Sequence, residues 1–301
     1  MTIACRNRAI LWSVAILLGL TATQASAEPA NWMREAVRAT ELAWLTKIVG
    51  RDAAREFIDN PQIVGGKAAP PGKWPAQVAL LQANITDNRE AQFCGGALIA
   101  DQYVLTAAHC IQRDANPSEI EVLLYTQSLA NGGIRQPIKR YWRHSEFDGY
   151  SPANDIALIE LEEAAGIDVE PNWLMSKKQA GKYIVTGEKA FVTGWGWTMS
   201  DPLEPTELQE VKVPFVNRDE CKDSVASGEI NGKMICAGYA EGGKGFCGGD
   251  SGGPLVVKHK NQWRLQAGIV SYTMSCKKPG IYGIYTNVSK YKRWIRKRIA
   301  E

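Results

Sequence analysis

The chain has 301 residues, of which 45% are hydrophobic and 22% are charged, and its formal net charge is +3. This length exceeds that of an average domain, although all-β folds often form single units of roughly 200 to 250 residues. The charge is too small to recruit a nucleic acid through overall electrostatics, so we expect no nucleic-acid partner. We therefore expect one large domain accompanied by shorter segments.

Residues 1–27 have the pattern of a secretory signal peptide. Arg6 and Arg8 precede the uncharged stretch 9–20, and Ala-Ser-Ala ends at Ala27 with small residues where signal peptidase reads. We predict cleavage after Ala27 and secretion, either to the extracellular space or to the periplasm of a bacterium. The alternative is a membrane anchor, but the uncharged stretch falls short of the roughly 20 residues that span a bilayer, so no stable anchor is expected.

Residues 28–62 form a charged segment whose apolar residues have a roughly helical spacing, and we interpret it as a pro-segment. Further along, short β-branched runs such as 77–81 and 189–193 are interrupted by Gly, Pro, Asn and Asp. Short strands separated by turn signals are typical of sandwich and barrel folds. Residues 63–301 are therefore predicted to form an all-β domain.

The chain has seven cysteines, and Cys5 lies in the predicted signal peptide. The mature chain thus keeps an even number, which suits disulfides formed in an oxidising compartment. Counting alone does not select a pairing. A zinc site would need closely spaced ligand pairs such as Cys-x-x-Cys, and the sequence has none, so no metal is expected.

Around Ser251 the sequence reads Gly-Phe-Cys-Gly-Gly-Asp-Ser-Gly-Gly-Pro-Leu. A serine hydroxyl is a poor nucleophile, so its chemistry requires a base and an orienting acid elsewhere. The candidates lie upstream, His109 in Leu-Thr-Ala-Ala-His-Cys and Asp155 in Asn-Asp-Ile-Ala-Leu-Ile. The two other histidines, His144 and His259, lie in polar stretches that we interpret as exposed surface, so His109 is the predicted base.

Two further motifs complete the pattern, Ile-Val-Gly-Gly at 63–66 and Gly-Trp-Gly at 194–196. In their order and spacing, these motifs resemble those of the trypsin/chymotrypsin family of serine peptidases, and the resemblance covers residues 63 to about 299. It implies two six-stranded antiparallel β-barrels and a C-terminal helix, with the barrels joined near 171–189. The active site would lie in the cleft between the barrels.

The resemblance also implies a role for each residue of the triad. Ser251 is the nucleophile that forms an acyl-enzyme, His109 is first the general base and then the general acid, and Asp155 orients the imidazole. The backbone N–H groups of Gly249 and Ser251 are the expected oxyanion donors. The resemblance implies three disulfides: Cys94 with Cys110, Cys221 with Cys236, and Cys247 with Cys276.

Asp250 precedes the predicted nucleophile, and a carboxylate buried there would need a cation or a changed protonation state. In the family this cation is the α-ammonium freed by cleavage before Ile-Val-Gly-Gly, so we predict cleavage between Gln62 and Ile63 and pairing of the new amine with Asp250. The precursor would be largely inactive. A trypsin-like activating protease would require Arg or Lys before the cleaved bond, but the residue there is Gln62. Either a different protease cuts there, or the enzyme cuts itself and accepts Gln as a P1 residue.

The predicted specificity pocket departs from that of trypsin. Gly245 stands where trypsins carry the aspartate that binds Arg or Lys, and Gly283 stands where some relatives supply the acid instead. Bulky Phe246 follows Gly245, and Thr273 maps to the pocket entrance. We therefore predict small to medium uncharged P1 residues. The substrate backbone is expected to pair as an added antiparallel strand with Ser271, Tyr272 and Thr273.

Residues 290–299 combine helically spaced apolar residues with a basic outer face. Relatives end in a helix that packs its apolar side on the second barrel and leaves its charges in solvent, and a membrane-surface role is the alternative. The segment 121–140 has no carboxylate beyond Glu121, so we expect no calcium in the loop where trypsin-like relatives bind it.

The sequence thus predicts a secreted serine endopeptidase, made as a zymogen, that hydrolyses peptide or protein substrates as a monomer without a cofactor. Two alternatives stay open: a catalytically silent relative that binds a partner through the same scaffold, and an endopeptidase with narrow processing specificity. The presence of all three triad residues favours the enzyme over the silent relative.

Overall fold

The computed structural model describes residues 65–166, 170–196, 206–222, 224, 229–275 and 278–301. The predicted signal peptide, the pro-segment, Ile63 and Cys276 lie outside these residues. No helix in the described ranges is long and apolar enough to cross a membrane.

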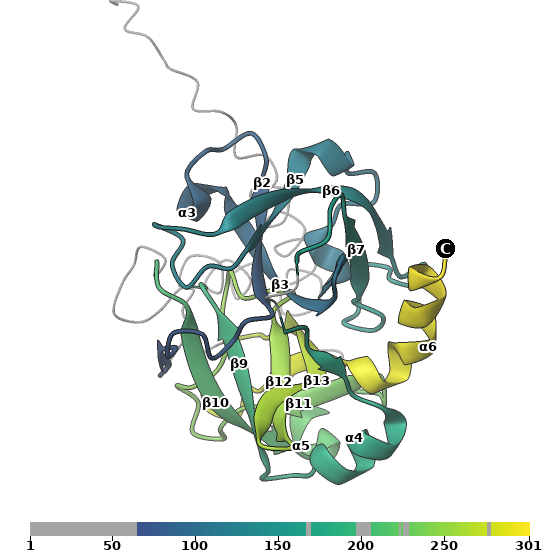
Figure 1. Ribbon diagram of the computed structural model, residues 1–301. Coiled ribbons are helices and arrows are strands. Elements are labelled where there is room, and N and C mark those ends of the chain that lie inside the picture. Colours follow the sequence, from purple (N-terminus) through teal and green to yellow (C-terminus); the bar gives the residue numbers. More distant parts are fainter. Residues whose placement is uncertain (1–64, 167–169, 197–205, 223, 225–228, 276–277) are drawn as a thin grey trace, which may run out of the picture. The chain divides into compact units, whose positions relative to one another are not determined.

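The first half of the described chain forms a closed antiparallel barrel (Figure 1). Around the barrel its strands are β2 (Gln77–Gln82), β3 (Gln92–Ala100), β4 (Tyr103–Thr106), β7 (Ala157–Leu161), β6 (Ile134–Arg143) and β5 (Ile120–Leu124). Short helices lie in its connections, namely α3 (Asn88–Ala91), η1 (Ala108–Cys110) and η2 (Pro117–Glu119).

The second half closes in the same way, because β9 pairs with both β10 and β12. Around this ring the strands are β9 (Lys189–Gly194), β10 (Gln209–Val216), β11 (Met234–Ala237), β14 (Gly283–Asn287), β13 (Gln262–Tyr272) and β12 (Pro254–His259). Two short strands join the sheet from outside the ring, β1 (Lys67–Ala68) against β10 and β8 (Trp173–Leu174), which runs parallel to β13. The prediction of two six-stranded antiparallel barrels is confirmed.

Three further helices accompany the second half of the described chain. They are α4 (Lys177–Tyr183), which precedes β9, α5 (Arg218–Lys222), which follows β10, and the C-terminal α6 (Val288–Ile299). The predicted C-terminal helix is thus present, and it begins directly after β14 (Figure 1).

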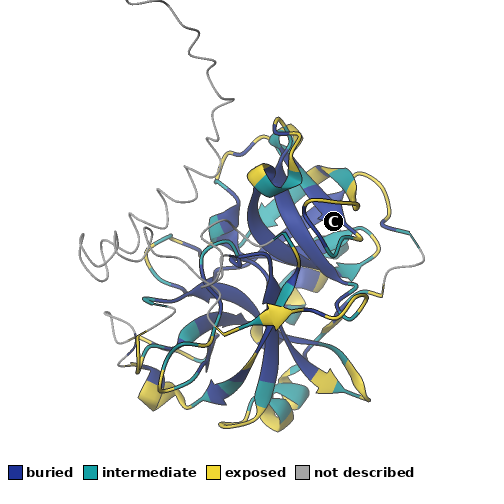
Figure 2. Cartoon of the chain, turned by 90° about the vertical axis from the view of Figure 1, so that its left-hand side faces the viewer, coloured by how far each residue is buried: buried dark blue, intermediate teal, exposed yellow. Residues whose placement is uncertain are grey.

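Strand β2 shows how the two barrels hold together. All six of its residues are buried, although a barrel strand whose outer face meets solvent would alternate buried and exposed side chains. Val78 and Leu80 lie in the core of the first barrel, whereas Ala79 and Leu81 pack with Phe191 of β9 and other residues of the second half. The outer face of β2 therefore packs against the second barrel, and Figure 2 shows buried strands, in dark blue, in both halves of the described chain.

The C-terminal helix contacts β13 of the second barrel, as expected, but its buried residues also reach the first barrel. Val288, Tyr291 and Ile295 are buried in the apolar cluster of the first barrel, and the hydroxyl of Tyr103 in β4 donates to the carbonyl of Ile299. The helix leaves β14 of the second barrel and crosses to the first, so its apolar side covers both.

The interpretation of His144 and His259 as exposed surface is wrong. His144 is half-buried, and its ring contacts those of Tyr291 and Trp294 at centroid distances of 5.4 Å. Burial lowers the pKa of His144 below its ordinary value. His259 is also half-buried, and its Nδ1 lies 2.7 Å from the hydroxyl of Tyr183. Neither environment was visible in the polar residues that flank these histidines.

Two of the predicted disulfides are present, Cys94–Cys110 with an S–S distance of 2.03 Å and Cys221–Cys236 with 2.08 Å. Cys247 is also disulfide-bonded. Its predicted partner, Cys276, lies outside the described residues, so that pairing stays a prediction.

Candidate active site

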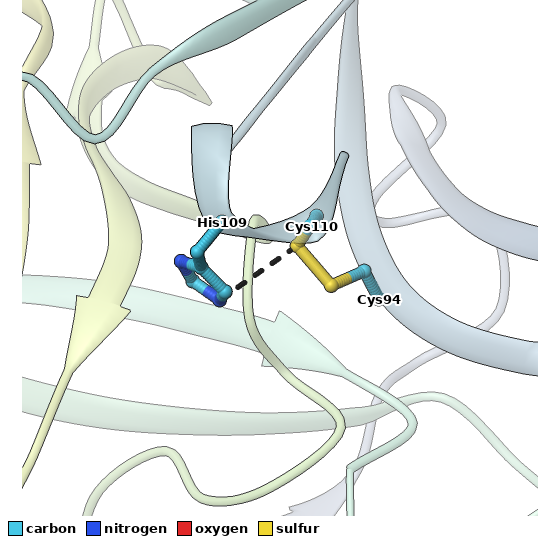
Figure 3. Close-up of side chains that lie close together, drawn as sticks. All are labelled: Cys94, His109 and Cys110. Atoms are coloured by element: carbon cyan, nitrogen blue, oxygen red, sulfur yellow. Dashed lines mark hydrogen bonds between the residues drawn. A yellow bond between two sulfur atoms is a disulfide. The ribbon is translucent and has the colours of Figure 1, made fainter. Parts of the chain in front are cut away.

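His109 lies in η1, directly after strand β4. The disulfide Cys94–Cys110 ties η1 to β3, and the Arg143 guanidinium donates from Nε to the carbonyl of Ala108 at 3.0 Å. The backbone is thus held on both sides of His109. Figure 3 shows the imidazole beside this disulfide, with Nε2 at 3.8 Å from the sulfur of Cys110.

Cys94, His109 and Cys110 are close enough together for their ligand atoms to hold a metal ion. Both sulfur atoms are consumed by the disulfide, however, and the sulfur ligand of a metal is a thiolate. The cluster is therefore not a metal site, and its disulfide positions the histidine.

The carboxylate of Asp155 lies against His109. Oδ1 accepts from the backbone N–H of His109 at 2.9 Å, and Oδ2 lies 2.7 Å from its Nδ1. Oδ2 also accepts from the hydroxyl of Ser271 at 2.6 Å, and the backbone carbonyl of Asp155 accepts from Thr286 at 2.7 Å. His109 and Asp155 belong to the first barrel, while Ser271 and Thr286 lie on β13 and β14 of the second. Both barrels thus hold this one residue.

Asp155 is 2% exposed, and two opposing effects act on its pKa. Burial raises the pKa, but the charge of His109 and the hydrogen bonds from His109 and Ser271 lower it, and the net result is a pKa below the ordinary value. An ionised carboxylate can only accept hydrogen bonds, so Nδ1 of His109 must carry the proton. Nε2 is then the ring atom that accepts a proton.

Ser251 is 7% exposed and lies in the turn before β12. Its carbonyl accepts from the N–H of Gly95 in β3 at 2.7 Å, so the first barrel holds the backbone of the predicted nucleophile. Gly95 follows Cys94, whose disulfide partner is the neighbour of His109. The next residue, Gly252, has φ +81°, and a Cβ there would collide with Thr106 and with the carbonyl of Gly95. Only glycine fits this contact between the barrels.

Gly249 has φ +88°, a conformation that favours glycine. Its carbonyl accepts from the side-chain amide of Gln92 at 2.9 Å. Gln92 is 1% exposed and opens strand β3, so the first barrel also holds the predicted oxyanion glycine. This role of Gln92 was missed, because a glutamine 157 residues from Gly249 gives no sequence signal of the contact.

Asp250 is fully buried. Its Oδ1 accepts from the N–H of Gly196 and its Oδ2 from the N–H of Cys247, each at 3.0 Å. A Cβ on Gly194 or Gly196 would collide with this carboxylate, which explains both glycines of the Gly-Trp-Gly motif. The predicted partner, the amine of Ile63, lies outside the described residues, and that pairing stays a prediction.

Of the predicted pocket residues, Phe246 and Gly283 lie in contact. The ring of Phe246 is 5% exposed and packs edge-on against Tyr285 with centroids 5.0 Å apart. A Cβ on Gly283 would lie 2.5 Å from Cε1 of Phe246, so the ring covers Gly283, whereas a Cβ on Gly245 would meet nothing within 4 Å. Thr273 is buried, and its hydroxyl donates to the carbonyl of Ser275 at 3.0 Å.

Ser271 and Tyr272, predicted to pair with the substrate backbone, form the end of β13. Tyr272 is 2% exposed, and burial raises the pKa of its hydroxyl well above the ordinary value. The contact between Ser271 and Asp155 was not predicted, since Ser271 was assigned to the substrate alone.

Comparisons with known proteins show the family to which the chain belongs. The family model described as trypsin matches residues 63–295. Coagulation factor XI of Bos taurus is 36% identical over 240 residues, which cover 78% of this chain and 37% of the relative, so the chain spans just over a third of that protein. Trypsin-1 of Astacus astacus is 36% identical over 239 residues, which cover 78% of this chain and 98% of the relative. The chain belongs to the trypsin family of serine peptidases.

Removing the hydroxyl of Ser271 tests the electrostatics of Asp155. A depressed carboxylate pKa stabilises the fold above the unfolded pKa, and this stabilisation is lost as the pH falls through the folded pKa. Because a hydrogen bond to a charged group contributes about 1.5 to 3 kcal/mol, we expect Ser271→Ala to lower the free energy of unfolding near neutral pH by about that amount. The deficit should narrow on acidification, as measured by urea unfolding across a pH series.

Thr286→Val is the matched control, because Thr286 is equally buried but bonds the backbone carbonyl of Asp155 rather than its carboxylate. Its deficit should stay constant with pH. A Ser271→Ala deficit that is equally independent of pH would contradict the proposed role of Ser271.

Proposed function

We propose that the chain is a secreted serine endopeptidase that hydrolyses peptide bonds through an acyl-enzyme. The observation that carries this proposal is the contact between the buried carboxylate of Asp155 and the imidazole of His109, with 2.7 Å between Oδ2 and Nδ1. A carboxylate that accepts a hydrogen bond from Nδ1 keeps the proton on that nitrogen. Nε2 is then available as a base, which is the requirement for activating a serine.

In the proposed mechanism, Oγ of Ser251 attacks the carbonyl carbon of the scissile bond while its proton moves to Nε2 of His109. The negative charge that develops on the carbonyl oxygen is received by the N–H groups of Gly249 and Ser251. His109 then gives its proton to the leaving amine, and the C–N bond breaks to form the acyl-enzyme. A water molecule attacks the ester, again with His109 as base, and releases the acid product and Ser251.

The oxyanion donors need a fixed backbone, because each contributes about 3 to 4 kcal/mol only when it is aimed at the transition state. The hydrogen bond from Gln92 to Gly249 and the bond from Gly95 to Ser251 support such a role. Both bonds come from β3, so one strand of the first barrel would fix both donors relative to His109.

For the P1 side chain, we propose a preference for small to medium uncharged residues such as Ala, Val or Leu. Glycine at 245 and at 283 supplies no carboxylate for Arg or Lys. The ring of Phe246 over Gly283 supports a shallow apolar pocket, and Thr273 would narrow its entrance.

Activation would follow from cleavage between Gln62 and Ile63 after export and removal of residues 1–27. The buried carboxylate of Asp250 supports this proposal, since it lies beside the nucleophile among glycines that leave room for it. The freed amine of Ile63 would pair with Asp250 and organise the oxyanion turn. Self-cleavage would require that the pocket accept Gln, and a separate activating protease would not.

Replacement of the nucleophile tests the mechanism. We expect Ser251→Ala in the processed protein to lower kcat by about 10,000-fold or more, because only binding and the oxyanion donors remain. Both proteins would be incubated with a diverse peptide library, and the cut sites would be read by mass spectrometry. Equal cutting by both proteins would contradict the mechanism, and no cutting by the parent would favour a catalytically silent binding protein.

Truncation of Phe246 tests the pocket. We compare kcat/KM for peptides with Phe or Tyr at P1 with kcat/KM for peptides with Ala at P1. We expect Phe246→Ala to raise this ratio by roughly 10- to 200-fold, since an enlarged apolar pocket discriminates by about 1 to 3 kcal/mol per group. Phe215→Ala removes another buried ring of the same apolar cluster and should leave the ranking of P1 residues unchanged. An unchanged ranking in Phe246→Ala would place the specificity elsewhere.

A further inference from the structure

Helices α4 and α6 carry a strong concentration of positive charge. Their sequences, Lys-Lys-Gln-Ala-Gly-Lys-Tyr and Val-Ser-Lys-Tyr-Lys-Arg-Trp-Ile-Arg-Lys-Arg-Ile, hold nine basic residues and no acidic one. Subtracting these nine from the net charge of +3 leaves the rest of the chain at −6. The small overall charge therefore conceals a molecule with one basic region on an otherwise acidic chain.

Most of these cations face solvent and form no ion pair within the described part of the chain. The exposed ones are Lys177, Lys178, Lys182, Lys290, Arg293, Arg296 and Lys297. Two others are engaged, since Lys292 donates to the carbonyl of Leu174 and Arg298 pairs with Glu301. In α6, Arg293 and Lys297 are four residues apart, and like charges at this spacing destabilise a helix. Burial of the opposite face of α6 in the protein core offsets this repulsion.

The two helices contact each other, and residues of both helices line each of two surface cavities. One cavity, of about 400 Å³, includes Arg218 and Lys290 in its lining. The other, of about 460 Å³, includes His259, Lys260 and Lys292. Among the described residues, no carboxylate lines either cavity. A linear polymer lying across α4 and α6 would thus meet these cations and no carboxylate of the cavity linings.

We propose that this surface, made by α4, α6 and the two flanking cavities, binds an acidic polysaccharide. Basic clusters of this density recognise polyanions. The cavities also offer amide and hydroxyl groups, from Gln179 in one and from Thr186 and Asn217 in the other, that suit the hydroxyls of a sugar. Sulfate groups and carboxylate groups on the polymer both carry the negative charge that pairs with the exposed lysines and arginines.

Other polyanions fit this surface less well. A helix that binds a lipid surface inserts its apolar face, but Tyr291 and Ile295 of α6 are buried in the protein core. Single-stranded nucleic acid stacks its bases on open aromatic faces, whereas the ring of Trp173 in the larger cavity has the guanidinium of Arg264 over it at 4.9 Å. Base-specific recognition of a duplex needs an element that enters its groove, and α6 is packed against the protein core through Val288, Tyr291 and Ile295.

The test is a binding measurement, so its failure is distinguishable from a failure of the proposed peptidase activity. The secreted protein would be titrated with dextran sulfate, polygalacturonate and neutral dextran, and with duplex DNA and phosphatidylserine vesicles for comparison. We expect both acidic polysaccharides, or the sulfated one alone, to bind, with an affinity that falls as salt rises. Neutral dextran should not bind.

The patch variant is Lys178→Gln, Lys290→Gln and Arg293→Gln, and we expect it to weaken binding at least about tenfold. The matched control, Arg89→Gln, Lys212→Gln and Lys222→Gln, removes the same charge from other surfaces and should weaken binding less than about twofold. Hydrolysis of a small peptide should be unchanged in both. No binding by the parent, equal weakening by both variants, or tighter binding to DNA or vesicles than to either polysaccharide would overturn the proposal.

Discussion

The buried carboxylate of Asp155 is the contact on which the rest of the site depends. It receives hydrogen bonds from His109 in the first barrel and from Ser271 in the second, and its backbone carbonyl is held by Thr286 of the second barrel. Without these donors burial would favour the neutral acid, and a neutral acid would no longer hold the imidazole in one tautomer. The same bonds that keep Asp155 ionised therefore also fix one barrel relative to the other.

The turn that carries Ser251 is held in a similar way from both sides. Strand β3 contacts it through Gly95 and Gln92, while the buried carboxylate of Asp250 binds backbone N–H groups within the second half of the chain. Positive φ angles at Gly249 and Gly252 let the backbone approach these partners closely. The glycines near the serine thus serve close packing between the barrels, and the apolar face of β2 supplies the area that keeps the barrels together.

Much of this arrangement could be predicted from the sequence, because short motifs specify it. The two barrels and the disulfides Cys94–Cys110 and Cys221–Cys236 follow from a resemblance carried by a few local patterns. Contacts between distant residues could not be predicted. The bond from Gln92 to Gly249 and the half-buried setting of His144 under α6 depend on where the chain folds back, and neither leaves a periodic or compositional signal.

The central claim is that His109 and Asp155 activate Ser251 across the interface between the barrels. It is tested most directly by treating the processed protein with a fluorophosphonate, which reacts with activated serines, and mapping the adduct by mass spectrometry. The account predicts one adduct per chain, on Ser251, and its loss in His109→Ala. Correctly processed protein that forms no adduct, or that is labelled at a serine other than Ser251, would contradict the account.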